Sequence, residues 1–366
     1  MTRDISSLIS AVNRVGIQNI SLLSRMTGVP TETIRYTMKK RLPALGLQVR
    51  TPVNHAALGL ERYFVSMRLT ESAEAQVAGL MKGLSSTAFL TYWCNAPLDR
   101  RYLSFFSVPV ALVDEFRGFL ERLAKERLLI DYACERLEWS RNPEIKGEHY
   151  DFATGEWSID WKEIGKHNES PPEPVKVEEP SPNPDIDAID TLVIKELEVD
   201  SWRNIAEIAR KLKLNERTVR WHYKKHIADI MHSNYVNWSS VTPKESTKAV
   251  GLIQEFNGIS TETLVKLRRL FNNFPFSWFE GGRKDGYYQV HAGLPANYFM
   301  ESLRYLNTNV KGLVDDWKVW TVDLSSIRWF TIPYENFDEE KGWFFSEEAA
   351  LQAVLPRKVK LRKTEP

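Results

Sequence analysis

A repeat inside the chain limits the possible folds more than any other feature of the sequence. Asn19 to Leu42 and Asn204 to Ile227 align without a gap over 24 positions, at a constant offset of 185 residues, and share seven identical residues. The identical residues include the basic pairs Arg35 and Arg220, Lys39 and Lys224, and Lys40 and Lys225. Two diverged copies with the same basic residues in the same register predict two related helical domains in one chain.

Each copy has the pattern of three short helices with turn residues before the third. The predicted helices are Ile5 to Val15, Ile20 to Thr27 and Thr31 to Leu42, and then Asp187 to Leu197, Ile205 to Leu212 and Glu216 to Ile227. In the third helix, apolar residues recur at i, i+4 and i+8, as in Ile34, Met38 and Leu42, so one side faces a small core. This is the pattern of a helix-turn-helix domain, in which the third helix enters the major groove of DNA.

The stretch after each helical domain predicts a β-α-β-β-α-β unit. The first unit has strands at 63–69, 88–94, 102–108 and 128–137 and helices at 73–84 and 111–126. The second unit has strands at 249–256, 276–280, 287–292 and 316–323 and helices at 261–272 and 296–307. Together these patterns predict an α+β chain with two copies of a (winged) helix-turn-helix domain followed by a ferredoxin-like domain.

A proline-rich acidic segment divides the chain into two halves. His167 to Asp185 contains six prolines and five acidic residues, a composition typical of an extended linker. The predicted domains are a helix-turn-helix domain at 1–52, a ferredoxin-like domain at 60–140, an aromatic extension at 141–166, the linker at 167–186, a second helix-turn-helix domain at 187–238, a second ferredoxin-like domain at 246–330 and a C-terminal extension at 331–366.

Composition favours a globular protein of the cytoplasm. The chain has 366 residues, 43% hydrophobic residues and a net charge of +1, so it is not a strongly basic DNA-coating protein. Its two cysteines cannot form a disulfide framework, and no apolar run is long enough to span a membrane. We therefore expect a cytoplasmic, nucleoid-associated protein without a membrane partner.

The outward side of each third helix carries the residues expected to contact DNA. Arginine can bind guanine edges through two hydrogen bonds, whereas lysine acts mainly at phosphates. The predicted DNA-binding residues are Thr31, Glu32, Arg35, Tyr36, Lys39 and Lys40 in the first copy and Asn215, Glu216, Arg217, Arg220, Trp221, Lys224 and Lys225 in the second. Because the neighbours of the shared basic residues differ, the two half-sites in double-stranded DNA need not match.

The second half resembles the Lrp/AsnC family of transcription regulators. The resemblance lies in Ile189-Asp190, Ile208-Ala209 and Thr218-Val219-Arg220, followed by a Gly-x-x-Asp-x-Tyr segment at Gly282, Asp285 and Tyr287. The first half is more diverged, and its similar part is Val53 to Leu69. The resemblance implies dimerisation through ligand-sensing (RAM) domains. Here it implies either a pseudo-dimer within one chain or a homo-oligomer.

The resemblance also implies an effector site near the turn between the middle strands. The second copy has Gly281, Gly282, Asp285 and Tyr287 there, and the effector would be an amino-acid-like molecule. A glycine pair can equally serve a tight hairpin, because glycine tolerates positive φ.

No catalytic constellation is apparent, so the sequence predicts a protein that is not an enzyme and has no cofactor. His222 and His226 have the i, i+4 spacing of a metal pair, but they lie on the third helix without a HExxH glutamate, so we expect no metal site.

Two alternatives remain open beside a sequence-specific transcription regulator. Sirohaem decarboxylases share the same two-domain plan, and for that chemistry the middle strands of this chain offer only His291. The other alternative is a protein-interaction scaffold that has lost DNA binding, which the near-zero net charge favours.

Overall fold

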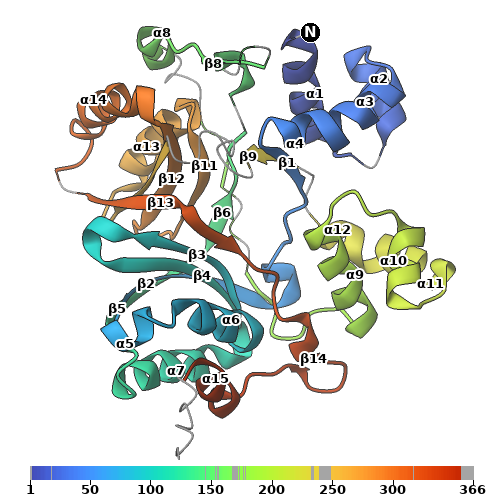
Figure 1. Cartoon of the computed structure of the whole chain (residues 1–366), viewed down its shortest axis with the longest axis vertical. Helices are drawn as coiled ribbons and strands as arrows, with labels where there is room; N and C mark the ends of the chain where they lie inside the picture. The colour runs from blue at the N-terminus through green and yellow to red at the C-terminus, as the bar shows by residue number, and fades with distance from the viewer. Residues whose placement is uncertain are drawn as a thin grey trace, which may run out of the picture.

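The duplicated sequence folds into two modules of the same plan, each a helix-turn-helix domain followed by a β-α-β-β-α-β domain (Figure 1). The computed structural model describes residues 2–17, 19–144, 146–152, 154, 156–166, 172, 174–175, 177, 179–231, 235–238, 249–315 and 317–355. The α+β fold class predicted from the sequence is confirmed.

The helices of the two helix-turn-helix domains begin and end within a few residues of the expected helices. In the first are α1 (Thr2–Val15), α2 (Ile20–Thr27), α3 (Thr31–Tyr36), a π-helical turn (Thr37–Arg41) and α4 (Leu42–Ala44). In the second are α9 (Ala188–Val199), α10 (Ile205–Leu212), α11 (Glu216–His222), a π-helical turn (Tyr223–Ile227) and α12 (Ala228–Ile230). Asn204 and Glu207 form a capping box at the start of α10, and Gly28 ends α2 at φ +71°.

The strand after each helix-turn-helix domain pairs with its counterpart from the other module. β1 (Leu47–Arg50) and β9 (Tyr235–Trp238) form an antiparallel two-stranded ribbon. The ribbon is therefore shared by the two modules, and it joins the two helical domains (Figure 1).

Nine strands of the two ferredoxin-like domains form one antiparallel sheet in the order β5-β2-β4-β3-β13-β10-β12-β11-β6. The first domain contributes β2 (Leu60–Leu69), β3 (Leu90–Ala96), β4 (Arg101–Pro109), β5 (Leu129–Leu137) and β6 (Trp139–Arg141). The second contributes β10 (Ala249–Phe256), β11 (Ser277–Gly282), β12 (Tyr288–Pro295) and β13 (Lys318–Trp329).

The C-terminal strand segment of each ferredoxin-like domain pairs first with a strand of its own domain and then with a strand of the other domain. β13 pairs with β10 through its first residues and with β3 through its end, where Trp329 lies opposite Tyr92. β5 pairs with β2, and after Glu138 the chain continues as β6, which pairs with β11 of the other domain. The edge strands β5 and β6 are therefore consecutive in the chain, and Glu138 connects them.

The two half-sheets face one another across a buried aromatic layer, and their helices cover the outer faces (Figure 1). Helices α5 (Glu71–Glu74), α6 (Val77–Thr87) and α7 (Val113–Lys125) cover the first half, and α13 (Thr261–Asn273) and α14 (Phe299–Val310) cover the second. Phe105 and Phe279 meet across the layer with ring centroids 4.9 Å apart. Strand alternation thus gives each half-sheet two buried faces.

The extension of each module packs against the ferredoxin-like domain of the other module. The first extension has β7 (Tyr150–Asp151), β8 (Glu156–Trp157) and α8 (Trp161–Lys166), and the C-terminal one has β14 (Phe337–Asp338), β15 (Gly342–Trp343) and α15 (Glu347–Val354). Ile164 of α8 joins the core of the second domain, and Leu351 of α15 joins that of the first. Val175 and Val177 of the predicted linker also pack on the second core.

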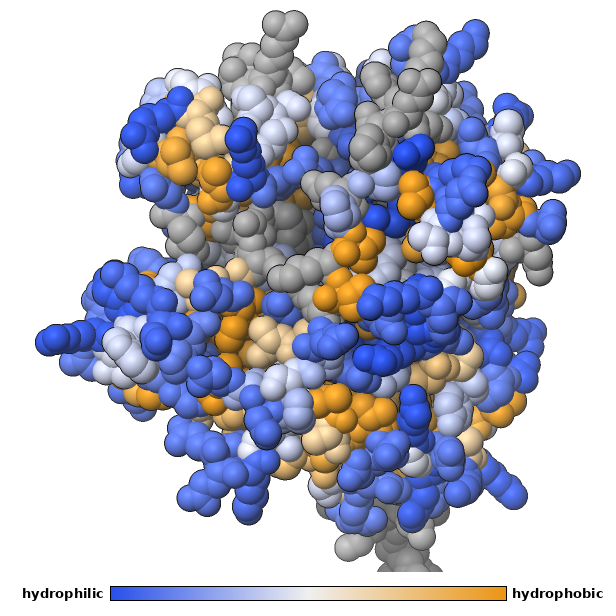
Figure 2. All heavy atoms as spheres, turned by 180° about the vertical axis from the view of Figure 1, so that it is seen from behind, coloured by the Kyte–Doolittle hydropathy of each residue, from blue (hydrophilic) through white to orange (hydrophobic). Residues whose placement is uncertain are grey.

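The surface opposite to the view of Figure 1 is mainly polar, with apolar side chains in separate patches (Figure 2). Within the described residues, no helix combines the length and apolar character needed to cross a bilayer.

Candidate functional site

The predicted DNA-contacting residues lie on the outward sides of α3 and α11 and their π-helical turns. Except for Thr31, which is half-buried, all of them are exposed. Tyr36 and Trp221, at equivalent positions in the two copies, are 64% and 54% exposed, which is unusual for large aromatic side chains. The two helix-turn-helix domains thus present similar surfaces.

Three of the basic side chains on these surfaces already have partners. Arg35 forms an ion pair with Glu32, and Arg220 forms one with Glu216, in each case within the helix. Lys39 lies over the ring of Trp202 in the other helix-turn-helix domain, with its ammonium nitrogen 5.8 Å from the ring centroid. Contact with DNA would therefore require these side chains to change partners.

The four predicted effector residues have different surroundings. Gly281 and Gly282 lie where β11 pairs with both β6 and β12, and a Cβ at Gly282 would be 2.4 Å from the Tyr287 carbonyl oxygen. Tyr287 is buried and donates a hydrogen bond to Glu255 at 2.8 Å, while Asp285 is exposed and pairs with Arg283. The glycines serve close packing of the strands, and the hairpin uses Gly286 at φ +94°. The effector role stays a prediction.

The centre of the aromatic layer holds a single histidine. His291 on β12 is completely buried among Phe64, Phe105, Trp278 and Phe279, and it stacks on Phe105 at 5.4 Å between ring centroids. Neither ring nitrogen has a hydrogen-bond partner among the described residues. Burial, and then the charge of Arg62, hold its pKa well below the usual value, so the imidazole is neutral.

A cavity of about 250 Å³ opens beside this layer. Its wall comes from three parts of the chain: the segment after β1, the second helix-turn-helix domain and the sheet. The lining includes Arg50, His55, Arg62, Asn142, Glu198, Phe279 and Trp329. The cavity therefore joins basic and polar groups to a wall of aromatic rings.

Arg62 connects the cavity to the aromatic layer. Its guanidinium lies 4.8 Å from the ring centroid of Phe105 and 5.4 Å from that of Phe279, the ring that packs on His291. It also donates a hydrogen bond to Ser140 at 3.1 Å. A guanidinium stacked on aromatic rings can still bind a carboxylate through its N–H groups.

Glu198 supplies a carboxyl group with an altered pKa at the same cavity. Burial raises the pKa of Glu198 to about 7, although a hydrogen bond from Tyr334 and the charges of Arg50 and Arg62 lower it. The Tyr334 hydroxyl donates this bond at 3.2 Å. A carboxyl group that titrates near neutral pH can both donate and accept a proton.

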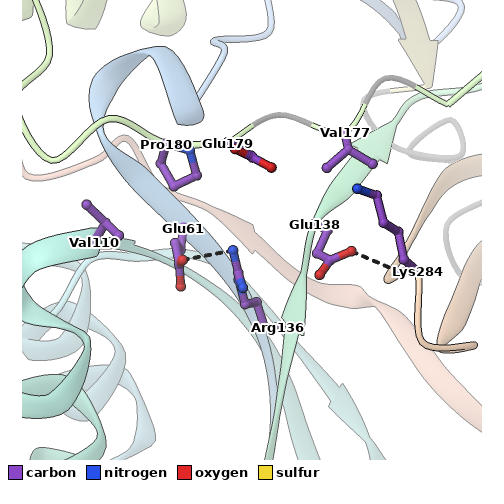
Figure 3. Close-up of a pocket in the computed structure, with 8 residues that line it drawn as sticks. All are labelled: Glu61, Val110, Arg136, Glu138, Val177, Glu179, Pro180 and Lys284. Atoms are coloured by element: carbon purple, nitrogen blue, oxygen red, sulfur yellow. Dashed lines mark hydrogen bonds and ion pairs between the residues drawn. The ribbon is translucent and has the colours of Figure 1, made fainter.

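A second cavity, of about 290 Å³, has a different character. Glu61 and Arg136 pair across it at 3.0 Å, and the backbone N–H of Lys284 donates to Glu138 at 2.9 Å (Figure 3). Val177 and Pro180 of the linker form another part of its wall. Because Glu61 and Arg136 already pair with one another and Glu138 accepts a backbone hydrogen bond, this cavity is a weaker candidate for a ligand site.

The residues of the first cavity were not predicted from the sequence. Arg50, Arg62 and Glu198 come from a ribbon strand, a sheet strand and a helix that are far apart in the chain. No local motif links them. Of the predicted residues, only His291 lies close to this region.

Comparison with known structures finds a similar fold along nearly the full chain. A crystal structure of the siroheme decarboxylase NirDL matches with a TM-score of 0.51 and 9% identity, over 96% of this chain and 98% of that chain. The same enzyme in complex with an iron-uroporphyrin III analogue matches with a TM-score of 0.49 and 9% identity, over 95% and 97%. A transcriptional regulatory protein of the AsnC family from Pyrococcus furiosus matches with a TM-score of 0.28 and 14% identity, over 37% and 88%.

No protein-family model matches the chain, and no curated protein matches it by sequence. At 9% identity, the first structural match shows the fold alone. The α+β fold that the Lrp/AsnC resemblance implied is present, and the family itself stays a prediction from the sequence. The prediction that the chain is not an enzyme is contradicted, because an enzyme shares the fold along the whole chain. The groups around the first cavity meet only in three dimensions, so no local motif marks them in the sequence.

Proposed function

We propose that this chain is an enzyme of the siroheme-decarboxylase kind, acting on an acidic tetrapyrrole at the cavity beside the aromatic layer. The observation that carries this proposal is the combination of Arg50, Arg62 and the high-pKa carboxyl of Glu198 around one aromatic-walled cavity. The full-length match to a siroheme decarboxylase supports the same assignment at the level of fold.

The chemistry of the lining suits such a substrate. A tetrapyrrole offers a flat conjugated ring, which can pack on Trp329 and Phe279, and carboxylate side chains, which the guanidinium groups can bind. The cavity is smaller than the roughly 300–1,000 Å³ of typical small-molecule sites, so it would hold one edge of the macrocycle. Its wall comes from separate domains, and such interfaces commonly adjust on binding.

The proposed reaction removes a carboxylate from a side chain of the ring. The bond between the carboxylate carbon and its neighbouring carbon breaks, carbon dioxide leaves, and the conjugated ring takes up the electron pair. Protonated Glu198 then gives its proton to the carbon, and water restores the proton on Glu198. The step is redox-neutral and uses one proton, and a pKa of about 7 keeps Glu198 partly protonated at neutral pH.

The test is binding and turnover of siroheme by the full chain. We expect a shift of the Soret band on mixing, and products that mass spectrometry identifies by loss of carbon dioxide. Arg62→Ala and Arg50→Ala should weaken binding, whereas Arg136→Ala, at the second cavity, should not. An unchanged Soret band together with an intact substrate would overturn the proposal.

A second candidate is binding of double-stranded DNA by the two helix-turn-helix domains. The paired exposure of Tyr36 and Trp221, each beside an arginine, favours it. Such side chains could contact thymine methyl groups and guanine edges. The outward surfaces of the two domains differ, so the half-sites would differ as well.

Recovery of bound DNA from a random pool tests this second candidate. If these helices read bases, Arg35→Ala and Arg220→Ala should each cost about 1–3 kcal/mol of binding free energy at the selected site. Failure to enrich any sequence over the input pool would remove the second candidate without affecting the first.

A further inference from the structure

We propose that the second helix-turn-helix domain contains a binding site for one divalent metal ion, with Zn²⁺ the best match to its ligands. The site lies between α9 and the turn that follows α11, apart from the cavity described above. It consists of Asp187, Asp190, His222 and His226, each of which offers one ligand atom within 4.8 Å of the others.

The four side chains converge from two helices. His222 Nδ1 lies 2.9 Å from Asp190 Oδ1 and 3.4 Å from Asp187 Oδ2, and His226 Nδ1 lies 2.7 Å from Asp190 Oδ2. Four ligands around a tetrahedral Zn²⁺ stand about 3.3 Å apart, given bonds of about 2.0 Å. The three separations are close to this value, and all four ligand atoms lie within 4.8 Å of one another, so the more distant side chains would have to move closer to enclose an ion.

The capping of α9 leaves ligand atoms available. Asp187 accepts the backbone N–H of Asp190 through Oδ1, and Asp190 accepts the backbone N–H of Asp187 through Oδ2. Asp187 Oδ2 and Asp190 Oδ1 take no part in this capping box, and both face the imidazole of His222. The backbone hydrogen bonds hold the two carboxylates in place, as second-shell contacts do in metal sites.

The charge of the cluster also favours a cation. Asp190 is completely buried, and among the described residues the ion-pair partners of these two carboxylates are His222 and His226. Buried charges are costly unless they are paired or bind a metal. Two carboxylates with neutral imidazoles carry a charge of −2, which one divalent ion neutralises.

The ligand set is typical of zinc held for structure. Imidazole nitrogens and carboxylate oxygens in a four-coordinate arrangement suit Zn²⁺, and the site keeps no open position for a substrate. An ion there would fix α11 against α9. The alternative is an ion-free network in which the two imidazoles donate directly to Asp190.

The first module provides an internal control because it lacks all four ligands. At the constant offset of 185, the matching residues are Thr2, Ile5, Thr37 and Arg41. The ring of Trp221 lies 4.9 Å from that of His222 and 5.3 Å from that of His226, so its fluorescence can report metal binding.

The test uses the full chain, freed of metal by a chelator and then titrated with Co²⁺ and Zn²⁺. We expect one equivalent of Co²⁺ with the visible absorption of tetrahedral cobalt, displaced by Zn²⁺, and a higher melting temperature with metal. Quenching by Co²⁺ should be largely absent in Trp221→Phe. Zn²⁺ binding without a preference for this site, or no binding at micromolar metal, would overturn the proposal.

Two variants test the location of the site and should leave the protein folded. Asp187→Asn removes a ligand, yet asparagine still caps a helix. His226→Gln changes a partly exposed side chain. Loss of a residue that only hydrogen-bonds to a metal ligand already lowers metal affinity about 10–100-fold. Each variant, which lacks a ligand itself, should therefore bind the metal at least ~100-fold more weakly. Arg41→Gln, at the matching position in the first module, should bind like the wild type. Unchanged affinity in both ligand variants would contradict the assignment.

Discussion

At the same depth in the two half-sheets, one module has Phe105 and the other has His291. Each lies four residues before the proline that ends its strand, Pro109 in β4 and Pro295 in β12, and the two rings stack on one another. The first module thus closes the aromatic layer with an apolar ring. The second module places a neutral imidazole there, and neither of its nitrogens has a hydrogen-bond partner in the part of the chain that the structure describes. Duplication has therefore kept the packing and changed the chemistry on one side only.

Phe105→His gives the first module the residue that the second module has at the matching position, and we expect it to be the most damaging substitution considered. It would bury a second imidazole against the first, with no hydrogen-bond partner provided for it. We expect a loss of about 2–4 kcal/mol in the free energy of unfolding, measured by denaturant titration. A loss below about 1 kcal/mol would mean that the layer admits water or rearranges.

Gly83→Ala tests the way in which the extension of one module covers the other. A Cβ at Gly83 of α6 would lie 2.7 Å from the carbonyl oxygen of Ala353 in α15. We expect a cost of about 1–3 kcal/mol in unfolding free energy, because two packed backbones must separate. Gly79→Ala is the matched control on the same helix, where a Cβ meets nothing within 4 Å, and it should be neutral or stabilising. Equal effects of the two would argue against a close contact between α6 and α15.

His291→Phe should act in the opposite direction from Phe105→His. It removes two unsatisfied nitrogens from a buried site, so the melting temperature should rise, with a gain of about 1–2 kcal/mol in unfolding free energy. Turnover of siroheme by the same variant reports whether the histidine is retained for function. A destabilised His291→Phe protein would show that the imidazole makes contacts that phenylalanine cannot replace.

Glu198→Gln should change how stability depends on pH. Folding raises the pKa of this carboxyl from its ordinary 4.5 to about 7, so the folded state binds the proton more tightly. The contribution of Glu198 to the free energy of unfolding is therefore fully present below pH ~4.5 and is lost as the pH rises through about 7. The side chain is partly exposed, so we expect a loss of about 1–2 kcal/mol over this range in the wild type. Unfolding free energies from pH 4 to 8 should be flatter in the variant, and parallel curves would contradict the raised pKa.

Local features of the fold followed from the sequence. The bounds of α2 and α10 agree with the predicted Ile20 to Thr27 and Ile205 to Leu212, because capping residues and apolar spacing are local signals. The predicted strands and their order along the chain also appear, with ends shifted by a few residues. Pairing of β13 with β3 was not predictable in this way, since it depends on strands more than 200 residues apart.

The candidate sites likewise combine local patterns that the sequence predicts with contacts between distant segments that it does not. His222 and His226 were visible as a spaced pair, but the two aspartates that face them lie at the start of another helix. Asp190 had been interpreted only as part of a family signature, and Asp187 only as the first residue of a predicted helix. For the first cavity, no spacing joins Arg50, Arg62 and Glu198, and only the packing of the ribbon, the sheet and α9 brings them together.

The exchange of last strands between the modules has a consequence for synthesis of the chain. When the first module leaves the ribosome, β3 has no β13 beside it, and the aromatic side chains at Phe64 and Phe105 have no opposite face. An open strand edge beside apolar rings is prone to aggregate until its partner arrives. Native pairing must wait for residues beyond 318, and contacts over such separations form slowly. The two modules thus depend on one another for completion, and the nascent first half is the stage at which chaperones would matter most.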